Sequence, residues 1–194
     1  MRFIAGSDSL LTLSESPKLA MWSEDYHNRW NVAAWYALYT RSRHEKFVDE
    51  ELRKRGIETF LPLRRVTRHW SDRKKIIEEP LFGSYIFVHI PIRERLAVLK
   101  TRGAVRFIGR SSFDPTEVPE QEISSVRRFV QHEIQIDPFP YLREGRRVYI
   151  RSGPFKGVEG FIVRKDNHCR LVISLNLLMQ SISVQVDQAC VEPI

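Results

Sequence analysis

The sequence predicts an α+β domain followed by a small β-barrel, and three observations lead to this fold class. Helix-type and strand-type segments of mixed length alternate over roughly the first two thirds of the chain, which is typical of helices packed on one face of a sheet. Two prolines in the segment Asp137–Pro140 then interrupt this order. Five short strand signals, separated by glycines and polar turns, fill the remainder and favour a small barrel.

In the first domain, apolar and aromatic runs predict the strands. They are Trp35–Tyr39, Ile57–Leu61, Tyr85–Ile90 and Val105–Ile108. The run Tyr85–Ile90 is almost entirely apolar, so we expect it to lie in the middle of the sheet. Between the second and third of these strands, Arg64–Glu79 is polar and basic, with Ser71–Asp72 as a turn candidate. We expect it to form a projecting hairpin of two polar strands.

Three helices are predicted between or after these strands. The first begins at a capping box, Ser42 and Glu45, and runs to about Arg55, with Gly56 as its left-handed stop. The residues expected on its buried face are Phe47, Val48 and Leu52. A short helix begins at Pro91, with Ile92, Leu96 and Leu99 repeating, and Pro119 opens the third. The apolar face of that third helix comprises Ile123, Val126, Val130 and Ile134.

The chain is predicted to consist of an N-terminal extension, two domains and a linker between the domains. Residues 1–30 are Ser-rich and without a clear period, so we expect an extension with a mobile backbone. The predicted domain limits are 31–136 for the first domain, 137–141 for a stiff linker and 142–194 for the barrel. Barrel strands are expected at Val148–Arg151, Val158–Lys165, Cys169–Leu175, Ser181–Val186 and Cys190–Glu192.

Composition limits the function classes. The net charge of +7 and the pI of about 9.6 suit a protein that works near polyanions, although a basic solvated surface would give the same values. The only cysteines, Cys169 and Cys190, show neither CxxC spacing nor a disulfide framework. We find no apolar run of membrane-spanning length and no signal peptide, so a cytoplasmic location is expected.

A set of aromatic residues is the first candidate for function. Tyr85 and Phe87 share one face of their strand, opposite Ile86 and Val88. Trp35 and Tyr36 are expected in the core. For the other rings of the set, the sequence does not decide between a position in the core and a position in an exposed protein-binding patch. These open positions are Tyr39, Phe82, Tyr85 and Phe87.

The basic hairpin is the second candidate, because its cations can neutralise phosphates and its rings can stack on an unpaired base. The residues expected to contact nucleic acid are Arg64, Arg65, Arg68, His69, Trp70, Arg73, Lys74 and Lys75. A charged hairpin that only keeps the protein soluble would carry the same residues.

A glycine-rich segment in the barrel is the third candidate. It contains Gly153, Pro154, Phe155, Gly157 and Gly160. It lacks the GKS/T ending and the strand-to-helix context of a phosphate loop, so we interpret it as a barrel turn. The six histidines show no metal-ligand spacing and nothing singles out a nucleophile, so neither an enzyme, a metal nor a cofactor is expected.

Several segments resemble a known family. Trp35–Tyr39, Glu45–Lys46, Gly56–Pro62 and Pro80–Val88 resemble the N-terminal domain (NGN) of the NusG family, and Gly145–Lys165 resembles a KOW motif. These pieces cover about residues 33–194 in the family's order. The resemblance implies a ferredoxin-like NGN α/β sandwich with a projecting hairpin, an SH3-like KOW barrel, and a transcription elongation or antitermination factor.

The resemblance also implies partners. NusG-like proteins bind the clamp helices of the largest bacterial RNA polymerase subunit through an apolar patch, which by motif is Tyr39, Phe82, Tyr85 and Phe87 here. The hairpin would lie near upstream DNA and the non-template strand. The KOW barrel would recruit a ribosomal protein or Rho, and the protein would act as a monomer away from membranes. Because Trp70–Lys75 resembles the specialised paralogues RfaH and UpxY, action on particular long operons is expected.

Two departures and two alternatives accompany this interpretation. Gly83 stands where the family commonly has proline, and Leu96–Val98 stands where RfaH has the His-Thr-Thr run that makes a second polymerase contact. The alternatives are a general NusG-type factor that couples to Rho or the ribosome, and an RNA- or ribosome-binding KOW protein.

Overall fold

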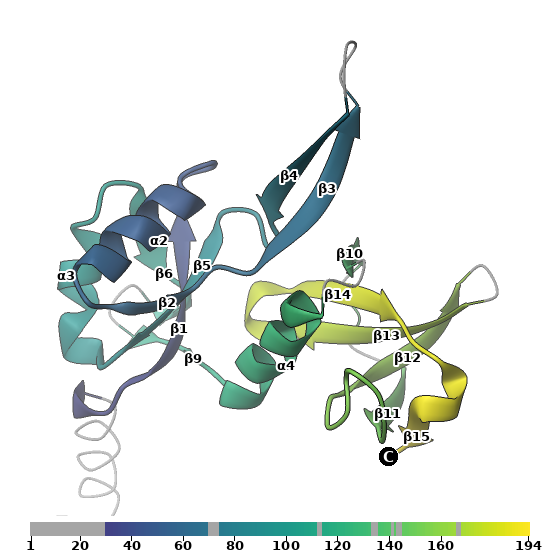
Figure 1. Ribbon diagram of the computed structural model, residues 1–194. Helices are drawn as coiled ribbons and strands as arrows, with labels where there is room; N and C mark the ends of the chain where they lie inside the picture. The colour runs from purple at the N-terminus through teal and green to yellow at the C-terminus, as the bar shows by residue number, and fades with distance from the viewer. Residues whose placement is uncertain are drawn as a thin grey trace, which may run out of the picture.

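The computed structural model describes residues 30–69, 74–111, 114–132, 136–140, 142, 145–165 and 168–194. The predicted fold class is confirmed, because an α/β domain is followed by a β-rich domain (Figure 1). None of the helices within these ranges is long and apolar enough to cross a membrane.

An antiparallel sheet forms the centre of the first domain. Its strands are β1 (Ala34–Thr40), β2 (Glu58–Phe60), β5 (Tyr85–Ile90) and β6 (Ala104–Phe107), in the order β2-β5-β1-β6, and β9 (Glu117–Val118) also pairs with β1. The central position predicted for the strand Tyr85–Ile90 is confirmed, since β5 lies between β2 and β1. A small hairpin, β7 (Gly109–Ser111) and β8 (Asp114–Pro115), follows β6.

Helix α2 (Glu45–Lys54) begins later than the sequence predicts. His44 occupies the N-cap position without a side-chain cap bond, so the predicted Ser42 capping box is wrong. The reason is tertiary, because the Glu45 carboxylate is buried and accepts a hydrogen bond from the Ser84 backbone N–H at 2.7 Å instead. The predicted stop is confirmed by Gly56, which has a φ of +77°. Phe47 was expected in the core but is 43% exposed.

The second helical segment is short. It consists of a 3₁₀ turn, η1 (Ile92–Glu94), and α3 (Arg95–Leu99). Val98 is buried, whereas Leu96 is 56% exposed, so the predicted repeat of Leu96 with Ile92 does not describe the buried face. Five helical residues make little more than one turn, and such a segment has too few positions to maintain an apolar stripe.

Helix α4 (Glu120–Gln131) follows Pro119, as predicted, with Ile123 and Val126 buried. Phe129 is also fully buried, although the predicted apolar face omits it. Ile134 was assigned to this face but lies outside the described residues.

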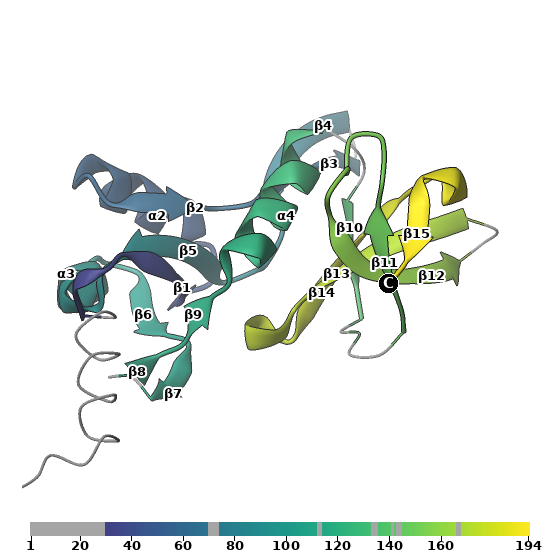
Figure 2. The same cartoon turned by 90° about the horizontal axis from the view of Figure 1, so that it is seen from below.

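Helices cover both faces of the sheet, which corrects the prediction of one covered face. Tyr36, Leu38, Ile86 and Val88 form one core cluster with α2 and α3. On the opposite face, Trp35, Ala37 and Phe87 form another cluster with α4. Alternate strand residues face opposite ways, so β1 and β5 supply apolar side chains to both clusters. Figure 2 shows α4 between the sheet and the barrel.

Polar contacts attach α4 to the sheet around Trp35. The Arg127 guanidinium lies over the Trp35 ring at 4.9 Å and forms an ion pair with Glu58 at 3.2 Å. His89 stacks on Trp35 with ring centroids 4.9 Å apart, and its Nδ1 lies 2.9 Å from the Glu58 carboxylate. These contacts position the helix that joins the two domains.

The second domain is a six-stranded antiparallel sheet. Its strands are β10 (Ile136–Phe139), β11 (Arg146–Ile150), β12 (Glu159–Lys165), β13 (His168–Leu175), β14 (Gln180–Gln185) and β15 (Val191–Pro193), with 3₁₀ turns η2 (Asn176–Leu178) and η3 (Gln188–Cys190). The order is β10-β14-β13-β12-β11-β15. All five predicted barrel strands are present within a few residues of their expected ends.

Strand β10 comes from the segment that the sequence predicts to be a linker. Ile136–Phe139 pairs with β14 in antiparallel register, with Pro138 opposite Ile182. Proline is compatible with this position because β10 lies at the edge of the sheet, where one side of the strand needs no ladder partner. The segment therefore extends the barrel sheet.

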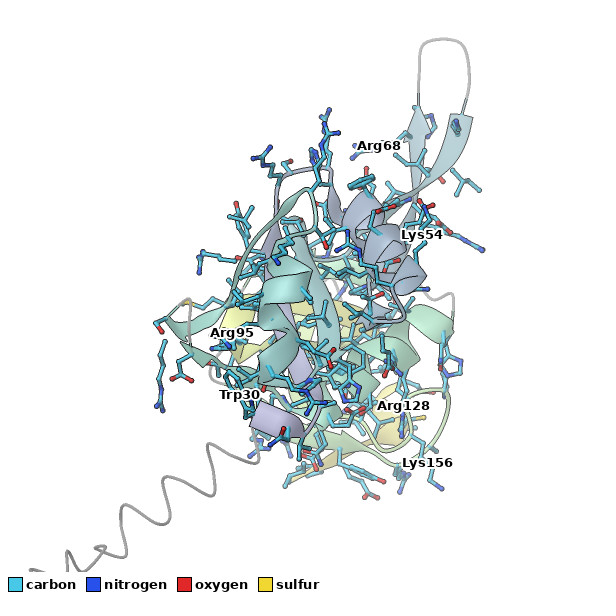
Figure 3. All side chains as sticks on the ribbon, turned by 90° about the vertical axis from the view of Figure 1, so that its left-hand side faces the viewer. Trp30, Lys54, Arg68, Arg95, Arg128 and Lys156 are labelled. Atoms are coloured by element: carbon cyan, nitrogen blue, oxygen red, sulfur yellow. The ribbon has the colours of Figure 1, made fainter. Side chains whose placement is uncertain are left out.

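The two domains share one apolar cluster. Barrel residues such as Phe155 and Leu171 belong to the same buried cluster as Phe129 of α4 and Phe87 of the sheet. The rings of Phe129 and Phe155 are 4.7 Å apart, and Arg128 donates a hydrogen bond to the Lys156 carbonyl. Figure 3 shows Arg128 and Lys156 side by side. Helix α4 is therefore packed between the sheet and the barrel.

Candidate functional site

The four candidate rings lie at one end of the sheet but differ in accessibility. Phe82 and Phe87 are buried, at 1% and 0% exposure. Tyr39 and Tyr85 are half-buried and directly opposite each other on β1 and β5, with centroids 5.4 Å apart in an edge-to-face arrangement. The interpretation as an exposed patch is therefore wrong for the two phenylalanines in this structure and holds in part for the two tyrosines.

The buried rings support the accessible ones. Phe82 packs edge-on against Phe87 at 6.1 Å, and Phe60 stacks on the same Phe87 ring. Tyr85 packs against the cluster that contains these rings. A buried aromatic layer thus lies next to the Tyr39–Tyr85 pair, and packing against it limits the conformational entropy that Tyr85 would lose on contact with a partner.

Arg106 belongs to the same surface, although no sequence pattern predicted it. It lies opposite Tyr39 in the β1–β6 register, and its guanidinium is 5.7 Å from the Tyr39 ring. No local signal marks this arginine, because its position depends on pairing between strands far apart in sequence.

The turn before β5 fixes the position of Tyr85. Ser84 has a φ of +65°, a left-handed conformation that L-residues other than glycine rarely adopt. Its backbone is held on both sides, because its N–H donates to the buried Glu45 carboxylate and its C=O accepts from Thr40 N–H at 2.8 Å. Gly83, which stands where the NusG family commonly has proline, is not the residue with positive φ.

The basic hairpin is present as predicted. Strands β3 (Leu63–His69) and β4 (Lys74–Pro80) pair in antiparallel register and project from the first domain (Figure 1). Residues 70–73 lie outside the described residues, and with them the candidates Trp70 and Arg73 and the expected Ser71–Asp72 turn.

Acidic residues on β4 reduce the charge of the hairpin stem. Glu79 binds Arg68, with an N–O distance of 2.7 Å, and also lies 3.6 Å from Arg64. The register places Arg65 opposite Glu78. Three of the four arginines predicted to contact nucleic acid therefore lie beside two carboxylates.

Nearer the hairpin end, His69 and Lys74 are paired in register and Lys75 follows, all three exposed. No acidic residue lies on β3 or on this end of β4. The excess positive charge of the hairpin is therefore concentrated toward its tip.

The glycine-rich segment forms a turn between β11 and β12, as predicted. Gly153 and Gly157 have φ values of +83° and +87°. A Cβ on Gly160 would lie 2.5 Å from the Val172 carbonyl oxygen, so glycine permits close approach of the neighbouring strand. Phe155 is buried against Phe129 and His132 of the α4 region, while Pro154 is exposed. The segment thus builds the contact between the domains.

A known protein family matches most of the first domain. Residues 33–127 match the NusG family model, described as transcription termination factor nusG. The transcription termination/antitermination protein NusG of Borreliella burgdorferi is 26% identical over 182 residues, covering 83% of this chain and 98% of that protein. The protein of the same name from Campylobacter jejuni is 27% identical over 164 residues, covering 79% and 92%.

Among solved structures, one described as domain interaction in Thermotoga maritima NusG has a similar fold. It aligns with a TM-score of 0.53 and 22% identity, covering 84% of this chain and 97% of that chain. The alignment spans both domains, so the α/β domain and the following β-rich domain occur together in that protein as well.

Proposed function

The chain belongs to the NusG family of transcription factors that act with RNA polymerase, and on this premise we propose that it binds the polymerase clamp helices and suppresses pausing or termination. The observation that carries the proposal is the half-buried Tyr39–Tyr85 pair next to a buried aromatic layer. Tyrosine and arginine are enriched among residues that dominate binding energy at protein interfaces. Arg106 beside Tyr39 adds the second of these residue types.

The hairpin would act on nucleic acid while the tyrosines hold the polymerase. Its tip carries Lys74, Lys75 and His69, which would contact the upstream edge of the bubble and the non-template strand. The stem arginines are held by carboxylates, so the tip is the part suited to phosphate contacts. Such a protein would favour elongation by binding alone, without covalent chemistry.

Operon specificity and the barrel partner form the finer part of the proposal. The resemblance of residues 70–75 to specialised paralogues supports action on particular long operons. A barrel that recruits a ribosomal protein or Rho would complete the activity. Occupancy of the protein along the chromosome would check the first point, because a general factor would be found on most transcribed genes.

Binding to purified core RNA polymerase tests the central claim. Tyr39→Ala and Tyr85→Ala should each weaken binding by roughly 30-fold, which corresponds to about 2 kcal/mol for a dominant interface residue. Tyr149→Ala on β11 is a matched control, because it removes a half-buried tyrosine from the barrel. If both sheet variants bind as tightly as the control, the tyrosine pair is not the docking surface.

A further inference from the structure

A cleft of about 870 Å³ lies between helix α4 and the barrel, away from the tyrosine pair and the hairpin. Figure 2 shows the helix alongside the barrel strands. Among the residues on the helical wall of the cleft are Gln121, Glu122, Ser125 and Arg128. Small-molecule sites are typically clefts of roughly 300–1,000 Å³ and often lie between domains. The size and the position of this cleft therefore suit a small ligand.

Polar groups on the helical wall lack partners. The Glu122 Oε2 atom is buried and has no hydrogen-bond partner. Within the part of the chain that the structure describes, the Gln121 amide and the Ser125 hydroxyl also form no hydrogen bond. Residues three and four apart share one face of a helix, so these groups lie together along the cleft. A buried acceptor without a partner is unfavourable, and a ligand that donates to the Glu122 carboxylate would remove this cost.

The barrel wall of the cleft offers a flat apolar surface. Phe161 on β12 lines the cleft and is only partly buried. Gly145 lines it as well, and a Cβ there would lie 3.4 Å from the Phe161 ring. Glycine at this position therefore leaves that part of the ring without a covering side chain. Partly accessible rings of this kind stack on flat ligands such as nucleobases.

Cations adjoin this ring. Arg147 is directly opposite Phe161 in the β11–β12 register and also lines the cleft. It is paired with Glu159 at 3.4 Å, with more than half of each side chain exposed. An exposed ion pair contributes little free energy, so Arg147 can turn to an anionic ligand at small cost.

Arg128 brings a second cation to the cleft from the helix. Its guanidinium donates to the Lys156 carbonyl, and a Cβ on Gly157 would lie 2.9 Å from its Nη1 atom, so glycine permits this position. The Lys156 side chain is exposed beside it (Figure 3). In the described ranges neither Arg128 nor Lys156 forms an ion pair. Their charge remains available to an anion.

These features together match a ligand with three parts: a flat ring, an edge with hydrogen-bond donors and an anionic group. A nucleotide has all three. Among the bases, guanine presents two neighbouring donors, N1–H and the N2 amino group, to the two oxygens of one carboxylate. Adenine and cytosine each present a single amino group on the corresponding edge. The unpartnered Glu122 carboxylate therefore favours guanine.

We propose that this cleft binds a free guanine nucleotide. The base stacks on Phe161 and donates to Glu122. The phosphates lie on Arg128 and Arg147. Because the ligand contacts α4 and the barrel at once, its binding also holds the two domains together. The proposal requires no polymerase and does not depend on the docking role of the tyrosine pair.

The test is isothermal titration of the purified full chain with GTP, which should bind saturably with a Kd below about 1 mM. ITP lacks only the N2 amino group and should bind roughly tenfold more weakly, since a bidentate contact becomes a single one. Guanosine lacks the phosphates and should bind at least about tenfold more weakly. Absence of saturable binding by GTP, or equal affinities for GTP and ITP, would overturn the proposal.

Variants of the cleft are compared by ratios of affinities, which a general loss of stability does not mimic. Glu122→Gln should abolish the preference for GTP over ITP, because an amide offers one acceptor oxygen. Arg128→Gln should reduce the preference for GTP over guanosine. Phe161→Ala should weaken GTP binding at least about fivefold through lost stacking. Glu120→Gln, on an exposed position of the same helix, is the matched control and should keep both ratios. A GTP-to-ITP ratio that is unchanged in Glu122→Gln contradicts the assignment of the base.

A competition arm separates a free nucleotide from nucleic acid. A single-stranded oligonucleotide of about 16 nucleotides that contains guanine is titrated against a bound fluorescent GTP analogue. Displacement at lower concentration than unlabelled GTP would assign the cleft to nucleic acid and overturn the proposal. Tyr39→Ala and Tyr85→Ala should bind GTP as tightly as the unaltered chain, so failure of the docking proposal and failure of this one give different results.

Discussion

The two faces of the first sheet are buried in different ways. One face is covered by α2 and α3, which are part of the same domain. The other is covered by α4, whose far side packs on the barrel through Phe129 and Phe155. The difference indicates that one core can form within the first domain alone, whereas the second is complete only when both domains are present.

The largest expected effect comes from removing the ring that the two domains share. Phe129→Ala should lower the free energy of unfolding by about 3–5 kcal/mol, because Phe129 is fully buried in the joint cluster. Leu52→Ala on α2 is the matched control, with an expected loss of about 2–5 kcal/mol.

The two variants differ in which domain each substitution destabilises. Urea unfolding followed by amide hydrogen exchange should show faster exchange in both domains for Phe129→Ala and in the first domain alone for Leu52→Ala. If exchange in the barrel is the same in both variants, α4 does not couple the two cores.

A smaller effect is expected at Ser84, in the turn that leads into β5. Ser84→Gly should remove the cost of a left-handed φ, which is on the order of 1 kcal/mol, while keeping the backbone bonds to Glu45 and Thr40. The expected result is a small rise in the thermal unfolding midpoint. Gly83→Ala, a change next to it at a position without positive φ, should give no such rise. A fall in the midpoint of Ser84→Gly would show that the serine side chain stabilises the turn.

The smallest effect concerns Glu122, which lines a cleft of about 870 Å³ between α4 and the barrel. Burial raises the pKa of this carboxyl above its ordinary value of 4.5, and its Oε2 is buried without a hydrogen-bond partner. The folded protein therefore holds the proton more tightly than the unfolded chain. Its contribution to stability is present at pH below 4.5 and is lost as the pH rises through the raised pKa.

Glu122→Gln removes this titration. Near neutral pH it should raise the free energy of unfolding by less than about 1 kcal/mol, since solvent reaches part of the side chain. Below the unfolded pKa the difference from wild type should vanish. Urea unfolding at several pH values checks this, with Glu120→Gln as an exposed neighbour on the same helix. A constant difference at all pH values would assign the effect to packing.

Local patterns predicted the elements well where local chemistry is sufficient. Gly56 ends α2 and Pro119 precedes α4, because positive φ and fixed φ are properties of those residues themselves. The central position of β5 followed from its apolar run, since a strand covered on both faces contains few polar residues.

Predictions from local sequence failed where a residue far away in the chain forms the hydrogen bond that a local partner was expected to form. Ser42 does not form a capping box with Glu45, because Ser84 takes the Glu45 carboxylate, and the double-proline segment is a strand because β14 offers it an edge. Contacts with distant residues also decided which of the four candidate rings are buried. Phe82 and Phe87 resemble Tyr39 and Tyr85 in sequence pattern, and only packing with α4 and the barrel separates the buried pair from the accessible pair.

The sequence by itself determined the order of strands and helices, the basic hairpin and the glycine turn of the barrel, since each depends on side-chain periodicity or on the φ preference of single residues. Only the tertiary structure decided which charges and rings remain available to partners. Neutralisation of Arg64 and Arg68 by Glu79, and the placement of Arg106 beside Tyr39, depend on strand register. These are relations between segments far apart in the chain, which no local pattern contains.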